Sequence, residues 1–404
     1  MFASYRRVLA VGGVRRLLAS SLLGRLPLGI SSLAILLLVR DASHSFAKAG
    51  LAVAAFTLAA AALAPLQGAL IDRVGQPSVL WMCGSVQAVL YVVLVAGTTV
   101  HTPSALTVVL AFGAGAFMPP LSSCARALWG ELFPEPGARE AAYALDAASQ
   151  ELIWTLGPLV TGVAVAIASP AAAVLLCAVM TIVGTAVFAS APSARAWRGS
   201  GLPRSRLGPL ASSRLRTVLY CLLLASFGVG ILQVGLPAVA VQAGSPAAAG
   251  VLLATWSVGS MIGAVVYGTR RWRRPAEDRY ALLLLVLAVA PAPLIAIHSL
   301  AGSIPLSALA GLPLAALLTC QFTLVGRLAP DGTTTEAFAW NISAAYAGMS
   351  VGVAVAGILV KTVGLGATFA VACLGGIVAS AIAAVARRRL VLPQTVGEGQ
   401  PAGG

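Results

Sequence analysis

Four charged residues lie inside runs of the sequence that are otherwise apolar: Arg25, Arg126, Asp146 and Glu151. A charged side chain at the centre of a membrane helix costs about 3 kcal/mol on insertion scales, so it usually faces a partner or a water-filled cavity. A carboxyl group in such a place can bind and release a proton when its surroundings alternate between wet and dry. These residue types therefore predict either proton coupling or a buried ion pair.

The spacing of these residues predicts which of them meet. Counted from the preceding basic residues, Arg25 lies about 13 Å and Glu151 about 15 to 18 Å along a helix, at 1.5 Å per residue. We therefore expect Arg25 to face Glu151 at mid-depth, and Arg126 and Asp146 to form a shallower pair at a cytoplasmic gate. Glu151 is then the candidate proton carrier, and Arg25 tunes its charge state. A static ion pair that only fixes helix packing is an alternative of equal weight.

Twelve apolar stretches have to position these side chains. Hydrophobic residues make up 59% and charged residues 9% of the 404 residues, against about 25% charged residues in a soluble domain. A helix of about 20 apolar residues spans the bilayer core of about 30 Å. The stretches cover residues 17–39, 49–71, 79–98, 104–125, 147–169, 171–191, 217–241, 247–268, 281–299, 302–325, 338–360 and 365–386. The sequence predicts an all-α integral membrane protein with twelve transmembrane helices, and it excludes an ordinary soluble enzyme.

The basic residues predict the orientation in the membrane. The net charge is +14, but the arginines recur in short clusters between apolar runs, which does not fit a nucleic-acid-binding face. With the N-terminus inside, all of the basic residues lie in or near cytoplasmic segments except Arg25, Arg40, Lys48 and Lys361. The positive-inside rule therefore places both termini in the cytoplasm. The preference for Arg over Lys and the Ala-rich composition suggest a bacterial inner membrane.

The chain divides into two similar halves. A polar stretch at residues 192–216, rich in Pro, Gly, Ser and Arg, reads as a cytoplasmic linker between a bundle at 1–191 and a bundle at 217–389, with a tail at 390–404. The segments at 49–56 and 249–256 align at an offset of 200 residues. Repeated spans of this kind predict two pseudo-symmetric six-helix bundles, an architecture used for alternating access.

The loop after the second span carries a specific motif. It reads GALIDRVGQ, with Gly68, Asp72, Arg73 and Gly75 spaced as G-x-x-x-D-R-x-G. With twelve spans in two halves, this loop resembles the signature of the major facilitator superfamily, although Gln76 stands where the family usually has a basic residue.

The resemblance implies that the acid and the base of the loop hold the cytoplasmic side shut in one conformation. Asp72 can accept hydrogen bonds from a helix N-terminus in the other half, and Thr333 and Glu336 form a capping-box pattern at one such helix start. The alternative for Asp72 and Arg73 is an ordinary solvated turn.

A second motif concerns the fifth span. Gly157, Pro158 and Gly162 resemble the Gly-Pro motif of proton-coupled antiporters in the same superfamily, although further glycines of that motif are absent. Gly and Pro loosen a membrane helix, which suits gating. The partial match favours export without excluding import.

Several polar and aromatic residues inside the spans are candidates for the substrate cavity. Spans 1, 4, 7 and 10 line the cavity in the superfamily, so the resemblance implies that Gln233 and Gln321 contact substrate. The further candidates are Trp154, Trp256 and Asn341. Interhelical hydrogen bonding, or packing for the tryptophans, is the alternative for each of them.

These observations predict a secondary active transporter that exports small amphipathic or drug-like molecules in exchange for protons. A proton-coupled importer of a small metabolite and a non-transporting membrane sensor or scaffold are the alternatives. The spans contain no histidine at mid-depth and no phosphate-binding loop, which argues against an enzyme or an ATP-driven pump. The six cysteines lie in apolar runs without ligand spacing, so we expect no metal and no cofactor. The partners are then the substrate, protons and lipid, and we expect a monomer.

Overall fold

The computed structural model describes residues 3–100, 103–197, 205, 207–246, 248–270, 272, 274–296 and 299–390. Residues 388–390 are described by their backbone alone. The described residues are helical and contain no strand. The helices are α1 (Ala3–Ala10), α2 (Val14–Ser43), α3 (Phe46–Val74), α4 (Gln76–Thr99), α5 (Ser104–Ala116), α6 (Leu121–Leu132), α7 (Pro136–Ile167), α8 (Pro170–Ala189), α9 (Pro192–Ala196), α10 (Ser213–Gln242), α11 (Ala248–Thr269), α12 (Ala276–Val289), α13 (Leu300–Leu328), α14 (Thr334–Thr362) and α15 (Gly364–Leu390), with short 3-10 helices η1 (Gly208–Ala211) and η2 (Ala292–Ile295).

The described residues form twelve spans that are long and apolar enough to cross a membrane. The predicted twelve-helix membrane fold is therefore confirmed. The fifth span differs from the prediction at its start, because α7 begins at Pro136, whereas the apolar pattern predicts a span from residue 147. Proline is favoured in the first turn of a helix, where its missing N–H has no intrahelical partner to lose.

Short polar residues start several of the spans. The side chains of Ser45, Ser169, Ser212 and Ser299 each accept a hydrogen bond from a backbone N–H three residues ahead. A serine at this position satisfies one of the N–H groups that a helix start leaves without a partner. The spans between these caps are built mainly from Ala, Leu, Val and Gly, so lipid and neighbouring helices stabilise them.

The fourth span is broken inside the membrane. Helix α5 ends at Ala116 and α6 begins at Leu121. Pro119 and Pro120 lie in the gap, and proline both lacks an N–H and clashes with the carbonyl of the preceding turn. The Gln67 side chain donates to the carbonyl oxygen of Ala116 at 2.7 Å, and an equivalent bond at 2.8 Å joins Gln87 to α5. Two glutamines from neighbouring helices thus stabilise the broken span.

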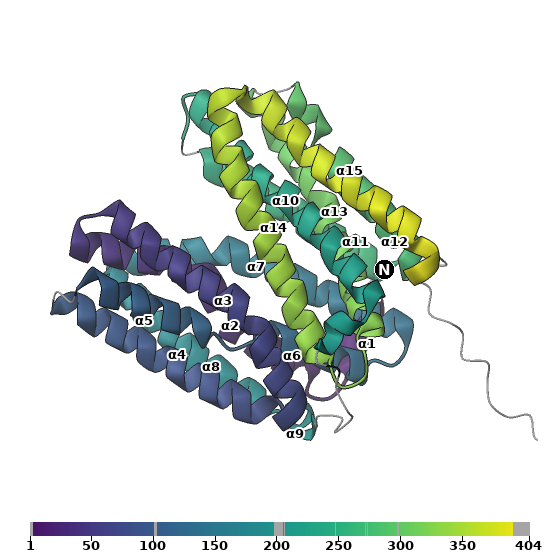
Figure 1. Ribbon diagram of the computed structural model, residues 1–404, viewed down its shortest axis with the longest axis horizontal. Coiled ribbons are helices and arrows are strands. Elements are labelled where there is room, and N and C mark those ends of the chain that lie inside the picture. Colours follow the sequence, from purple (N-terminus) through teal and green to yellow (C-terminus); the bar gives the residue numbers. More distant parts are fainter. Residues whose placement is uncertain are drawn as a thin grey trace, which may run out of the picture.

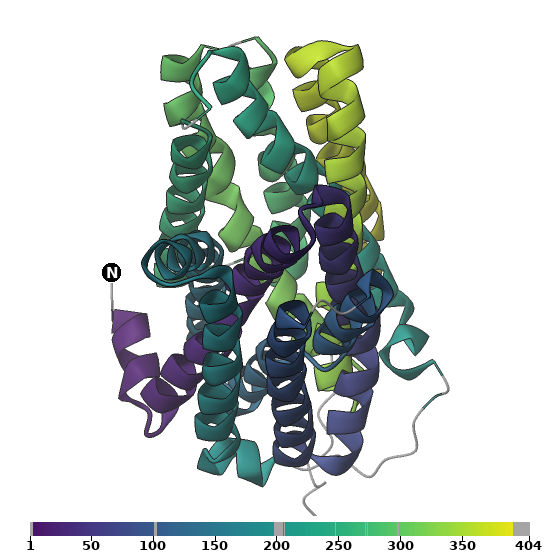
Figure 2. The ribbon, with the colours of Figure 1, turned by 90° about the vertical axis from the view of Figure 1, so that its left-hand side faces the viewer.

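The spans gather in two groups, one of α2 to α8 and one of α10 to α15. Figure 1 shows the first group in purple to teal and the second in teal-green to yellow. The turned view separates the same two groups (Figure 2). Helix α7 packs against α11 and α13 of the second group, and α14 packs against α3 and α6 of the first. These two helices therefore carry most of the interface between the bundles.

We call the end of the molecule at which α3 meets α4 the linker end. Helices α1, α6 and α9 also lie there (Figure 1). Part of the predicted linker, residues 198–204 and 206, and the predicted tail after residue 390 lie outside the described residues. Gly75 has a φ of 95° and allows the sharp turn between α3 and α4.

Candidate functional site

Three of the four charged residues found inside the spans form one buried cluster. The Arg25 guanidinium contacts an oxygen of Asp146 at 2.7 Å, and Arg126 contacts the other oxygen at 2.7 Å. The amide oxygen of Gln150 accepts a further bond from Arg25 at 2.7 Å. The predicted pairing of Arg126 with Asp146 is confirmed in its geometry. The cluster joins α2, α6 and α7.

The predicted pairing of Arg25 with Glu151 is wrong, and so is the expectation of two separate depths. Asp146 and Glu151 are five residues apart on α7, so at about 100° per residue their side chains point about 140° apart around the helix. Asp146 faces α2 and α6. A long arginine side chain easily spans the remaining difference in depth.

Glu151 points into the other bundle. Its side chain is 4% exposed and faces the hydroxyl groups of Ser257 and Ser260 on α11. Among the residues that the structure describes, no basic side chain forms a salt bridge with Glu151. This carboxyl group therefore sits in a contact between the bundles without a compensating cation.

A small cavity lies beside the charge cluster. It has about 50 Å³ of free space between α2, α3, α6, α7 and α14. Its polar lining comes from Gln67, Ser122, Gln150 and Tyr346, and its apolar lining includes Leu28, Ala60, Ala64, Met118 and Ile342. The cavity is therefore amphipathic, and both bundles contribute to it.

Most of the other cavity candidates lie elsewhere. Gln321 donates to Asn341 at 2.8 Å in the interior of the second bundle, and Gln233 donates to the Met349 sulfur at 3.3 Å. Trp256 is buried against α13. These residues do not line the described cavity.

Trp154 is the candidate that meets the cavity wall. Its ring lies 6.4 Å from the ring of Tyr346 in a T-shaped contact. This contact joins α7 to α14 across the bundles. Sequence reasoning missed Tyr346 and Ser122, because no motif distinguishes them from other small or aromatic residues in the spans.

The motif at the end of α3 closes the linker end. The Asp72 carboxylate accepts hydrogen bonds from the backbone N–H groups of Thr335 at 3.1 Å and Glu336 at 2.9 Å, in the first turn of α14. Gly68 permits this approach, because a Cβ there would lie 2.7 Å from the Glu336 backbone. Arg73 is exposed. The expected capping of a helix in the other half by Asp72 is therefore confirmed in its geometry.

The expected capping box of α14 does not form. Thr333 is the N-cap residue, but its side chain makes no capping hydrogen bond and donates instead to the Pro330 carbonyl at 2.7 Å. The Asp72 carboxylate occupies the position of the cap. A carboxylate is a stronger acceptor than a hydroxyl, and the positive end of the helix dipole favours it.

A second contact between the bundles lies at the corresponding place in the other half. Arg279 on α12 forms a bidentate ion pair with Glu140 on α7 and donates to the Tyr267 hydroxyl at 2.6 Å. The Tyr5 hydroxyl of α1 donates to the Ala264 carbonyl at 3.1 Å, and burial raises the pKa of Tyr5 to about 12. An ion pair from the first turn of α12 thus joins the second bundle to α7 of the first bundle.

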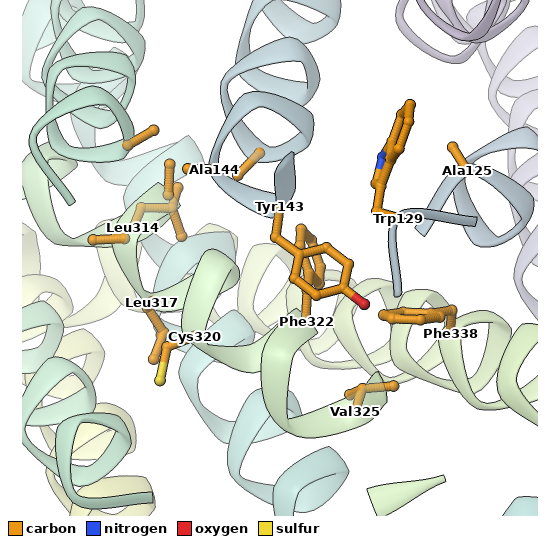
Figure 3. Packing of buried hydrophobic residues seen from close by; sticks show 14 of the residues in the cluster. Ala125, Trp129, Tyr143, Ala144, Leu314, Leu317, Cys320, Phe322, Val325 and Phe338 are labelled. Carbon is orange, nitrogen blue, oxygen red and sulfur yellow. The ribbon is translucent and has the colours of Figure 1, made fainter. Parts of the chain in front are cut away.

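Aromatic side chains fill the space between these two contacts. The Tyr143 ring lies 6.1 Å from Phe322 and 6.0 Å from Phe338 (Figure 3). The Arg126 guanidinium stacks 3.9 Å from the Phe322 ring centre. Residues of α6 and α7 therefore pack directly on α13 and α14.

The two groups of helices diverge beyond this interface (Figure 1). In the half of α7 far from the linker end Leu159 is 60% exposed, and in the same half of α14 Ile358 is 63% exposed. The hydrogen bonds and ring contacts between the bundles all involve the linker-end half or the middle of these helices, as far as the described residues reach. The interface is thus closed at one end only.

The Gly-Pro segment of α7 serves the first bundle. A Cβ on Gly157 would strike the backbone at Gly29 on α2, so the two helices touch there. Pro158 lies inside the continuous helix, and nothing lies within 4 Å of the place where a Cβ on Gly162 would be.

Comparison with known proteins decides the family. The model of the Major Facilitator Superfamily matches residues 17–305. The chain belongs to the major facilitator superfamily. No curated protein matches the chain at a significant level.

Solved structures share the fold of this superfamily member. The crystal structure of the human organic anion transporter MFSD10 (TETRAN) matches with a TM-score of 0.69 and 19% identity, over 91% of this chain and 99% of that one. A bacterial homologue of the iron transporter ferroportin in an outward-facing state matches with a TM-score of 0.71 and 14% identity, over 92% and 98%. A bacterial homologue of the iron transporter ferroportin in an outward-facing state with soaked iron matches with a TM-score of 0.70 and 17% identity, over 93% and 98%.

The family and the fold identify the chain as a multi-pass membrane transporter and not an enzyme. A transporter of this superfamily binds a small-molecule substrate within the membrane. The amphipathic cavity, the buried cluster and the one-sided interface are its candidate working parts.

Proposed function

We propose that the protein exports small amphipathic molecules across a bacterial inner membrane in exchange for protons, by alternating access. The linker end faces the cytoplasm in this proposal. Support comes from the basic residues, which gather in the segments of that end, as the positive-inside rule requires of cytoplasmic segments.

If the linker end faces the cytoplasm, the described conformation is outward-facing. The Asp72 cap on α14 and the Arg279 ion pair to Glu140 lie at the cytoplasmic end of the interface and hold it shut. The exposed outer halves of α7 and α14 are consistent with an opening on the other side. Alternating access then requires these two contacts to break together when the cytoplasmic side opens.

The single observation that carries proton coupling is the position of Glu151. Its carboxyl group lies in the part of the interface that must open, against Ser257 and Ser260, while the neighbouring Asp146 is already held by two arginines. A buried carboxylate without a cation is costly, whereas its neutral form needs only hydrogen bonds. Protonated Glu151 therefore fits the closed interface, and ionised Glu151 favours its opening to cytoplasmic water.

The exchange follows from this preference. A proton that enters from outside neutralises Glu151 and holds the cytoplasmic side closed while substrate leaves. When the cytoplasmic side opens, Glu151 meets water and releases the proton, and substrate enters the cavity. Closing again with Glu151 ionised costs about 3 kcal/mol on the insertion scale, and bound substrate has to supply this free energy, so the empty ionised carrier rarely returns and substrate leaves in exchange for the proton.

Transport by the purified protein in liposomes tests the proposal. A pH-sensitive dye inside the liposomes reports proton movement when a concentration gradient of an amphipathic compound is applied across the membrane. A panel of such compounds is tested one at a time. The wild-type protein should move protons in the direction opposite to that of the compound. Glu151→Gln should abolish this proton movement, while Glu131→Gln, an exposed acid at the end of α6, should not.

Two results would contradict the proposal. Undiminished proton movement in Glu151→Gln would remove the assigned role of this residue. Protons that move in the same direction as the compound would indicate import by symport.

A further inference from the structure

The break in the fourth span leaves an unusual concentration of hydrogen-bond donors inside the membrane. The backbone N–H groups of Ser122 and Ser123, in the first turn of α6, make no backbone bond within the described part of the chain. The N-cap residue, Pro120, has no side chain that could cap them. The start of a helix carries partial positive charge, so these N–H groups favour an anion.

Unpartnered serine side chains accompany this helix start. Ser122 is 5% exposed and lines the cavity, and its hydroxyl group makes no hydrogen bond to any described residue. The Ser123 hydroxyl is fully buried and also lacks a partner there. A buried polar group that lacks a partner is costly, so such groups usually serve a ligand or water.

The charge cluster behind the cavity is not balanced. Two arginines surround one carboxylate, since Asp146 is the only acid in contact with Arg25 or Arg126 among the described residues. Glu151 points away from them to α11. The cluster therefore retains one positive charge, and stacking of Arg126 on Phe322 adds no negative charge to cancel it.

Gln150 connects the two arginines to the cavity. Its amide oxygen accepts bonds from Arg25 at 2.7 Å and from Arg126 at 3.5 Å. With the oxygen held by both arginines, the amide N–H groups remain for the cavity that Gln150 lines. The Tyr346 hydroxyl, which lies close to both arginines, lines the same cavity.

We infer that the cavity at the start of α6 binds the anionic group of the substrate, a carboxylate on an apolar body. The carboxylate lies at the backbone N–H groups of Ser122 and Ser123, at the Ser122 hydroxyl and at the Gln150 amide. It balances the excess charge of the arginine pair. The apolar body packs on Leu28, Met118 and Ile342. The role of this site in export rests on the proposed function, whereas binding of the anion depends only on these residues.

Matched probes test the inference in the full-length protein in lipid nanodiscs. The probes are 4-phenylbutyrate, 4-phenylbutanol and 4-phenylbutylamine, which differ only in the polar group. Isothermal calorimetry should show that phenylbutyrate binds about ten-fold more tightly than the other two, as one charge-assisted hydrogen bond contributes about that factor. Ser122→Ala should weaken phenylbutyrate binding about ten-fold, and Ser226→Ala, a buried serine on α10 of the other bundle, should leave it unchanged.

A charge change gives an independent test. Gln150→Glu has nearly the same shape and supplies the missing negative charge, so it should abolish the preference for phenylbutyrate without lowering the unfolding temperature. Equal binding of the three probes, preference for the amine, no binding of phenylbutyrate, or a preference that survives Gln150→Glu would each overturn the inference.

Failure of the site and failure of the transport proposal are distinguishable. The binding experiments need no gradient, so discrimination by charge without proton exchange would overturn the exporter and leave the site. Proton exchange in liposomes with no discrimination by charge would overturn the site and leave the exporter.

Discussion

Removing the Asp72 carboxylate should open the closed end of the interface. Asp72 accepts two backbone hydrogen bonds from the first turn of α14, at 3.1 and 2.9 Å. A hydrogen bond to a charged group contributes about 1.5 to 3 kcal/mol, and part of this is recovered from water when the interface opens. We take the loss in Asp72→Ala as about 3 kcal/mol, which shifts the ratio of closed to open molecules about 150-fold. Asp72→Asn keeps one acceptor, so its shift should be about ten-fold.

Spin-label distances measure this shift. Labels at Val100→Cys and Val363→Cys lie on exposed residues at the opposite end of the two bundles, and the six native cysteines are buried and so poorly reactive. When the linker end opens, the opposite end closes, so Asp72→Ala should shorten the distance between the labels. Asp278→Asn is the matched control, because Asp278 pairs with Arg387 inside the second bundle.

An unchanged distance distribution in Asp72→Ala would refute this reasoning. It would mean that the hydrogen bonds to α14 do not contribute to the closed state. An equal change in Asp278→Asn would show that the effect comes from the loss of any acid at this end.

Three further predictions concern the same interface and the cluster behind it. Gly68→Ala should shorten the same label distance, because its Cβ would meet the α14 backbone, whereas Gly162→Ala, with nothing within 4 Å, should not. Glu140→Arg should also open the linker end, and adding Arg279→Glu should restore part of the closed population by re-forming the ion pair, as the label distances would report. Asp146→Asn leaves two arginines buried without a carboxylate, so it should destabilise the protein by about 3 to 5 kcal/mol. The loss is measured as a lower unfolding temperature in nanodiscs. An unchanged unfolding temperature would contradict the role of Asp146 in stabilising the two arginines.

Composition and periodicity were enough to predict the spans, because each helix has to be long and apolar to cross a bilayer. The motif was enough to place Asp72 at a helix start in the other half. The break at Pro119 and Pro120 is readable from the two prolines, but the apolar run around them hides it.

The partners of the buried charges were not predictable in the same way. Counting residues gives the depth of a side chain but not the direction in which it points around the helix. Arg25 was therefore assigned to Glu151, although Asp146 points to it. The ion pair of Arg279 with Glu140 joins α12 to α7, which are far apart in the sequence and share no motif.

The most direct test of the account is the pH dependence of the distance between Val100→Cys and Val363→Cys. In the otherwise wild-type protein, molecules closed at the linker end should dominate at acid pH and decline as the pH rises, because ionised Glu151 cannot stay buried against α11. Glu151→Gln should stay closed at every pH. A wild type that does not respond to pH, or a variant that responds as the wild type does, would contradict the account.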